Sequence, residues 1–165
     1  MLAAIMQPTF LPWLGYFDLI DQAEVFVFLD TVQFEKQTWQ QRNRIRTAKG
    51  LEWLTVPVFI KGKFGQPIRE VVIRTTEFPD KHIRALKQHY GKTAYYAAHM
   101  GELEEILISV RRDPLLARLN IALIRWLLGA FGIQCRLVCA SEVPAQGQRS
   151  TRLVSILQGL GCTRY

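Results

Sequence analysis

Two short apolar runs, residues 2–6 and 25–29, stand near the start of the chain, and a helix-sized segment, residues 16–23, separates them. Uninterrupted apolar runs of this length are typical of strands that are buried on both faces of a parallel sheet. The pattern therefore predicts a compact β-α-β unit with two adjacent parallel strands. Gln7 follows the first run and Asp30 follows the second. Open parallel sheets bind their ligands at the carboxyl ends of the strands, so these two positions are candidates for a site.

The middle and the end of the chain predict further strands and helices. Residues 42–46 and 52–58 flank Lys49-Gly50, which predicts a hairpin. Strands are expected at residues 68–73 and 134–140, and helices at about 79–90, 102–111, 115–130 and 151–160, the last one capped by Ser150. The order predicts an α/β fold. We expect a three-layer sandwich whose sheet is mostly parallel, with an antiparallel addition over residues 42–73.

Length and composition limit the classes of protein that the chain can represent. Its 165 residues are 49% hydrophobic and 21% charged, which is typical of a globular domain and not of a disordered segment. We find no linker and no internal repeat, and we expect residues 1–165 to form one domain. No apolar run approaches the roughly 20 residues that span a bilayer, and the start of the chain lacks a signal-peptide pattern. We therefore expect a soluble, cytoplasmic protein.

An excess of basic residues suggests an anionic partner. The chain has 21 Lys and Arg against 14 Asp and Glu, a net charge of +7. This charge favours a nucleotide, a sugar nucleotide, a nucleic acid or an acidic lipid surface, although a merely basic surface explains it equally well.

Cysteines and histidines indicate neither a disulfide framework nor a metal site. Cys135 and Cys139 lie in one expected strand, where a separation of four residues places them about 13 Å apart, too far to share a metal. We expect them to be core thiols. His82, His89 and His99 lack the spacing of metal ligands, and we expect them on the surface.

Side chains able to bind a ligand are concentrated between residues 7 and 46. The candidate site residues are Gln7, Trp13, Gly15, Tyr16, Asp30, Gln33, Lys36, Trp39, Arg42, Asn43 and Arg44. A loop that ends in Gly15 and opens into a helix offers free N–H groups to a phosphate or carboxylate. Alternatively, Pro12, Trp13 and Tyr16 form a hydrophobic staple at the start of the helix.

The polar candidates also allow more than one interpretation. The carboxylate of Asp30 can bind a ribose hydroxyl, hold a metal or cap the next turn. The amides of Gln7, Gln33 and Asn43 suit hydroxyls or a base edge. Arg42 and Arg44 alternate along an expected strand, so they share one face, where they form either an anion clamp or a solvated surface.

These residues resemble the pattern of the WbqC-like family. The matching positions are Gln7, Pro8, Pro12, Trp13, Gly15, Tyr16, Phe17, Asp30, Val32, Gln33, Phe34, Lys36, Trp39, Arg42, Asn43 and Ile45. Gln41 stands where the family usually has Asn. The resemblance continues through residues 54–58, 87–90 and 147–165. Family members usually run on past a Tyr like Tyr165, so we expect this chain to lack the family's C-terminal segment.

The first β-α-β unit is also similar to that of nucleotidylyl transferases, a Rossmann-like variant in which an H-x-G-H loop holds ATP phosphates. Trp13 and Tyr16 stand in the place of those histidines, and neither carries a positive charge at neutral pH. Phosphate charge would then have to be met by Lys36, Arg42, Arg44 or a metal.

The resemblance to the WbqC-like family implies a role in bacterial surface-polysaccharide (O-antigen) biosynthesis, where members have been described as glycine transferases. It suggests an aminoacyl transferase or a nucleotide-dependent amide-forming enzyme that uses ATP or another nucleotide with Mg²⁺. A sugar carboxylate would be activated and then attacked by an amine, with Asp30 positioning the nucleotide or metal. No residue stands out as a covalent nucleophile. The alternative is a non-catalytic protein that binds a nucleotide sugar or, less well, a nucleic acid.

Overall fold

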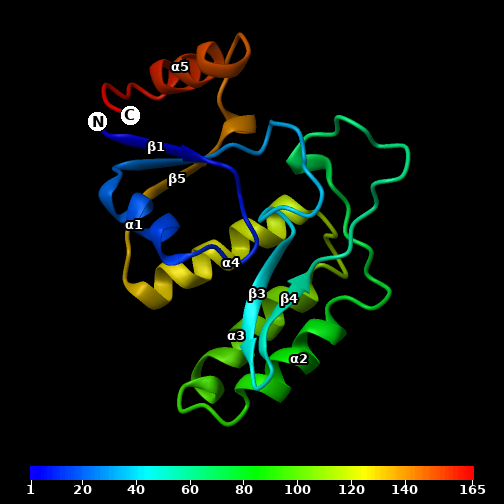
Figure 1. Ribbon diagram of the computed structural model, residues 1–165. Coiled ribbons are helices and arrows are strands. Elements are labelled where there is room, and N and C mark those ends of the chain that lie inside the picture. The colour runs from blue at the N-terminus through cyan, green and yellow to red at the C-terminus, as the bar shows by residue number, and fades with distance from the viewer.

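Three parallel strands form the main sheet of the protein (Figure 1). The computed structural model describes residues 1–165, and the strand order is β1 (Ala3–Met6), β2 (Val25–Phe28) and β5 (Arg136–Cys139). Helix α1 (Leu14–Gln22) connects β1 to β2, and these two strands pair in parallel. The predicted β-α-β unit is therefore confirmed.

Helices cover both faces of this sheet. Phe26 and Phe28 of β2 pack against α1 and α4 (Leu116–Phe131), whereas Val25 and Val27 pack towards α5 (Arg149–Gly159) on the other face. All four side chains are fully buried. A strand with water on neither face needs no polar position, which explains the uninterrupted apolar run. Two helical layers and the sheet between them form the three layers that were expected.

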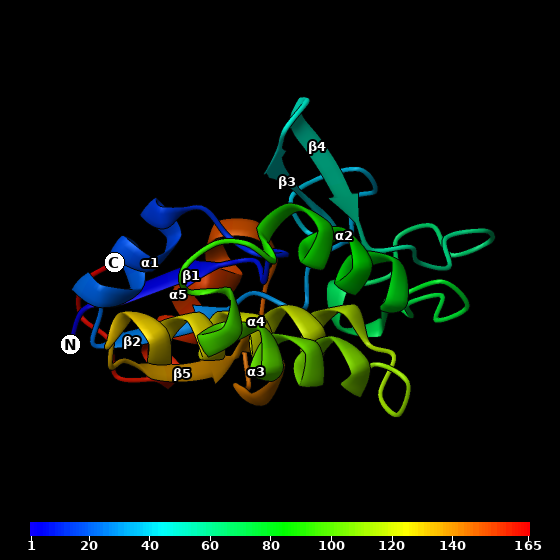
Figure 2. The same cartoon turned by 90° about the horizontal axis from the view of Figure 1, so that it is seen from below.

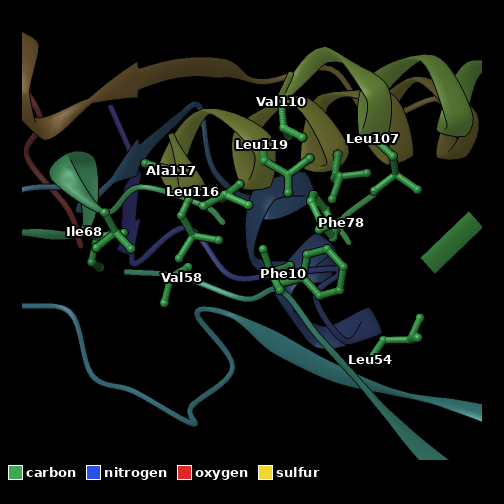
Figure 3. Packing of buried hydrophobic residues seen from close by; sticks show 14 of the residues in the cluster. Phe10, Leu54, Val58, Ile68, Phe78, Leu107, Val110, Leu116, Ala117 and Leu119 are labelled. Carbon is green, nitrogen blue, oxygen red and sulfur yellow. The ribbon is translucent and has the colours of Figure 1, made fainter. Parts of the chain in front are cut away.

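A second hydrophobic cluster lies beside the sheet (Figure 3). It is enclosed by the hairpin β3 (Arg42–Thr47) and β4 (Gly50–Thr55), by α2 (Asp80–Tyr90) and by α3 (Tyr96–Ser109). We call the cluster around Phe26 and Phe28 the first hydrophobic cluster. Helix α4 contributes Ile121, Ile124 and Leu128 to the first cluster and Leu116, Leu119 and Leu123 to the second. Helix α4 therefore packs against the parallel sheet and against α3, as Figure 2 shows.

Two expectations about the middle of the chain need correction. The antiparallel hairpin exists, but it forms a separate two-stranded sheet and does not extend the parallel one. Residues 68–73 do not form a strand. They contain the 3₁₀-helix η1 (Ile68–Glu70) and single bridges of Val72 and Ile73 to other segments. Ile68 and Val71 are both fully buried, and their spacing of three residues is the period of a 3₁₀-helix.

The predicted helices are present, with changes at their ends. Helix α3 begins at Tyr96, whereas the pattern placed its start at Glu102, and Ser150 lies inside α5, whose cap position is Gln148. No helix combines the length and the apolar composition needed to cross a bilayer.

Candidate functional site

The loop after β1 and the segment between β2 and β3 lie against each other. The Phe10 N–H donates to the carbonyl oxygen of Trp39 at 2.9 Å, and the Gln40 side-chain amide donates to Oε1 of Gln7 at 2.8 Å. The candidate Gln7 is therefore hydrogen-bonded inside the protein. Its interaction fixes the position of the two segments relative to each other.

Asn120 of α4 is hydrogen-bonded to both of these segments. Its side chain is fully buried, and Nδ2 donates to the carbonyl oxygens of Pro8 at 3.0 Å and Gln40 at 2.8 Å. A buried carbonyl that lacks a partner is costly, so one amide satisfies a buried acceptor in each segment. The amide of Asn43 adds another link, because Nδ2 donates to the carbonyl of Leu11.

These contacts bring two indoles to one groove. Trp13 and Trp39, each about half exposed, line a groove of about 420 Å³ together with Asn43, Arg44 and Leu51. We call this the tryptophan groove. Four of its five residues, Trp13, Trp39, Asn43 and Arg44, belong to the candidates that the sequence indicated.

Two guanidinium groups share a third indole, Trp53, which packs against Trp39. Cζ of Arg42 lies 4.2 Å from the ring centroid of Trp53, and Cζ of Arg44 lies 5.4 Å from it. Trp53 in turn contacts Trp39, with ring centroids 5.7 Å apart. Neither arginine forms an ion pair with a carboxylate. Two cations held together on an aromatic face without a counter-ion favour the binding of an anion.

At the start of α1, the Trp13 indole packs against Gly15 and Tyr16, whereas the binding of a phosphate there stays a prediction. Nε1 of Trp13 lies 2.9 Å from the place where a Cβ of Gly15 would stand, so the missing side chain leaves room for the indole. Trp13 and Tyr16 pack edge to face, with centroids 5.8 Å apart, as the staple alternative predicted. Tyr16 is fully buried and its hydroxyl donates to the carbonyl of Gln7 at 3.0 Å. Burial raises the pKa of Tyr16 above its usual value.

Asp30 is buried and caps a turn. Its carboxylate accepts from the Ser141 N–H at 3.0 Å and from the Ser141 hydroxyl at 2.6 Å. The turn follows β5, so Asp30 links the ends of two strands that neighbour each other in the sheet. Of the three roles considered for Asp30, the structure shows turn capping, although the capped turn is at Ser141 and not the turn that directly follows Asp30. A role towards a ribose or a metal stays a prediction.

Gln33 and Lys36 lie at another surface. They line a groove of about 430 Å³ with Phe34 and with residues of the loop that contains Ile60 and Phe64. The structure therefore divides the candidates among the tryptophan groove, this second groove and the interior.

Cys135 and Cys139 are poor nucleophiles. Burial raises the pKa of Cys139 to about 11, with further contributions from Glu142 and Asp30, and burial also raises the pKa of Cys135. Both side chains pack against the first hydrophobic cluster, as expected of core thiols.

The expectation of a surface position for His82 is wrong. Its side chain is only 5% exposed and lies edge-on to Phe10 and Phe78, with centroids 6.1 and 4.8 Å away. Neither ring nitrogen has a hydrogen-bond partner. Burial, together with Lys81, lowers the pKa of His82 to about 4, so the ring is neutral at neutral pH. The signal was its position four residues before Leu86, on the buried face of α2.

A cavity of about 380 Å³ between the hairpin and α2 was not foreseen. His82 is one of its lining residues, and Glu52, Arg74, Glu77 and Lys81 also line the cavity without forming ion pairs with one another. These side chains come from three separate segments, so no motif in the sequence could have predicted the cavity.

Comparisons with known proteins confirm the resemblance to the WbqC-like family, which the sequence indicated over nearly all of the chain. Residues 7–165 match the WbqC-like protein family. An uncharacterized protein of Mycobacterium tuberculosis is 36% identical over 162 residues, which cover 98% of this chain and 70% of that relative. No solved structure matches the chain.

Proposed function

The chain belongs to the WbqC-like protein family, and we propose that it acts in bacterial surface-polysaccharide biosynthesis by binding a nucleotide-activated sugar in the tryptophan groove. One observation carries the proposal. Two indoles and the Arg44 guanidinium line one open groove, and Trp53, which contacts Trp39, holds Arg42 and Arg44 on its ring without carboxylate partners.

Each part of such a ligand has a suitable partner there. Indole faces stack on nucleobases, at about 1–3 kcal/mol per base. Guanidiniums bind phosphate oxygens through two parallel hydrogen bonds, and they retain their charge at any physiological pH. The groove volume of about 420 Å³ also falls in the usual range for small-molecule sites.

The chemical step that we propose is amide formation, as in an aminoacyl or glycine transfer. A nucleoside triphosphate would first activate the sugar carboxylate as an acyl nucleotide, with release of pyrophosphate. The amine nitrogen then attacks the acyl carbon, the bond from that carbon to the phosphate oxygen breaks, the nucleoside monophosphate leaves, and the amine proton passes to solvent water. Arg42 and Arg44 would stabilise the departing phosphate. Asp30 is enclosed in the interior with its carboxylate bound to Ser141, and no group of three or more His, Cys, Asp or Glu side chains that could hold a metal includes it. We therefore assign no step to a metal.

Calorimetric titration of the protein with UDP-glucuronate, UDP-glucose and UMP tests the proposal. Arg42→Ala and Arg44→Ala are each expected to weaken binding of UDP-glucuronate by about 10- to 100-fold, as loss of a charge-assisted hydrogen bond does. Trp39→Ala is expected to weaken it about as much through lost stacking.

Arg118→Ala is the matched control, because Arg118 is an exposed arginine of α4 that pairs with Asp113, a residue just before that helix. Its effect is expected to stay below about twofold. Equal losses in all three arginine variants that disappear in added salt would indicate diffuse attraction and contradict the proposal. Tighter binding of a short oligothymidine than of any nucleotide would favour the nucleic-acid alternative instead.

A further inference from the structure

A protruding loop, residues 59–66, exposes apolar and basic side chains together. Figure 2 shows it extending away from the body of the molecule between β4 and η1. Phe64 at its tip is 98% exposed, and Phe59 and Ile60 are about half exposed. Single exposed apolar residues are common, but three within six positions on a projecting loop are not explained by folding.

Lysines surround these apolar side chains. Lys61 and Lys63 are exposed within the loop, and Lys36 stands across the groove that Ile60 and Phe64 line. None of the three forms an ion pair. Glu35 is the acidic residue of that groove, so the local charge remains positive.

The loop is held at its base and free at its tip. The Phe59 N–H donates to the carbonyl of Val72, and the Phe34 N–H donates to that of Gln66, each at 2.9 Å. Gly62 and Gly65 adopt φ values of +72° and +78°, which side chains other than glycine rarely adopt. These two turns direct the tip outward, so the exposure of Phe64 is built into the backbone.

We propose that loop 59–66 binds an anionic lipid surface. Its apolar tip would enter the region between headgroups and acyl chains, and Lys36, Lys61 and Lys63 would contact the phosphates. The three lysines without ion pairs favour an anionic lipid surface as the occupant, because their charges complement lipid phosphates. An uncharged protein groove could bind the phenyl ring, but it would leave these charges without a partner. The inference does not depend on the function of the tryptophan groove.

Sedimentation of the full chain with unilamellar vesicles tests the inference. Vesicles of phosphatidylcholine with about one third phosphatidylglycerol should bind the protein about a hundredfold more tightly than phosphatidylcholine alone, since each lysine near an anionic surface contributes about fivefold. Phe64→Ser should reduce binding by about tenfold or more, because the apolar area of the side chain is lost. Phe64→Leu should stay within about threefold of the parent, since lipid recognises apolar area and not ring shape.

Matched controls separate this loop from the rest of the basic surface. Tyr95→Ser removes another aromatic side chain, 76% exposed, outside the loop and should leave binding unchanged. Lys61→Glu with Lys63→Glu should reduce binding at least about twentyfold. Lys87→Glu with Lys92→Glu changes the net charge equally at exposed positions and should have much less effect.

Several outcomes would overturn the inference. One is failure of the parent protein to bind the anionic vesicles, and another is an equal loss in the two lysine pairs. A third is loss of binding in Phe64→Leu as severe as in Phe64→Ser, which would indicate a shaped protein pocket. Dimerisation of the parent that Phe64→Ser abolishes would instead identify the loop as an interface between copies of the chain.

Discussion

Replacing Asn120 by Leu is expected to lower the free energy of unfolding by about 2–4 kcal/mol. The Asn120 side chain is fully buried, and its amide is the hydrogen-bond donor to the carbonyls of Pro8 and Gln40. Leu has a similar volume, so the main cost is two buried carbonyls without this donor, about 1–3 kcal/mol each. Part of this cost is offset, because Oδ1 of Asn120 is itself buried without a partner and would be removed.

Urea denaturation followed by circular dichroism measures this change. Arg118→Leu is the control on the same helix, since its side chain and its partner Asp113 are both exposed, and we expect a change below about 1 kcal/mol there. Asn120→Leu should also weaken ligand binding in the tryptophan groove, because the segments that carry Trp13 and Trp39 lose their common anchor. A destabilisation below about 1 kcal/mol would refute the reasoning, since it would mean that the two carbonyls find other partners.

Three further predictions concern single residues. Gly15→Ala should displace the Trp13 indole, which a Cβ would approach to 2.9 Å, and weaken groove binding in calorimetry several-fold with little change in melting temperature. Burial lowers the pKa of His82 from 6.5 to about 4, so the folded protein takes up a proton at this ring less readily than the unfolded chain does. The free energy of unfolding should therefore fall by up to about 3 kcal/mol as the pH drops from 6.5 to 4. Urea titrations at pH 7 and 4.5 should show that His82→Phe lacks this component. Cys139, whose pKa is raised to about 11, should escape iodoacetamide at pH 7.5 in the native protein and react in urea, as mass spectrometry can establish.

The local pattern of apolar residues was sufficient to predict the strands β1 and β2 and the helix α4. A continuous apolar run such as Val25–Phe28 has no face that could meet water, so it must lie inside a sheet covered on both sides. The helix between two such runs sets them parallel. The alternation of Arg42 and Arg44 likewise placed both guanidiniums on one face of β3, where they share the ring of Trp53.

Residues 68–73 and His82 show where periodicity was ambiguous. A short apolar segment is compatible with either a strand or a 3₁₀-helix. At Ile68 the conformation depends on a distant segment, because the Ile68 N–H donates to the carbonyl oxygen of Val32. His82 is an acceptable surface residue on an isolated helix. It becomes buried because Phe10, from the loop after β1, and Phe78, just before the start of α2, pack against that face of the helix.

The residue types available for a site are evident from the order of amino acids alone: indoles, guanidiniums and amides are concentrated between residues 7 and 46. The tertiary structure decided which of them meet. Asn120 fixes Pro8 and Gln40 across 112 and 80 residues of chain, and Asp30 reaches Ser141 across 111. Side-chain periodicity reports which face of one element is buried, but it carries no information about which loops share a hydrogen bond. For that reason Trp13, Trp39 and Arg44 come together in one groove, while Lys36 lies at another surface and Asp30 is enclosed in the interior.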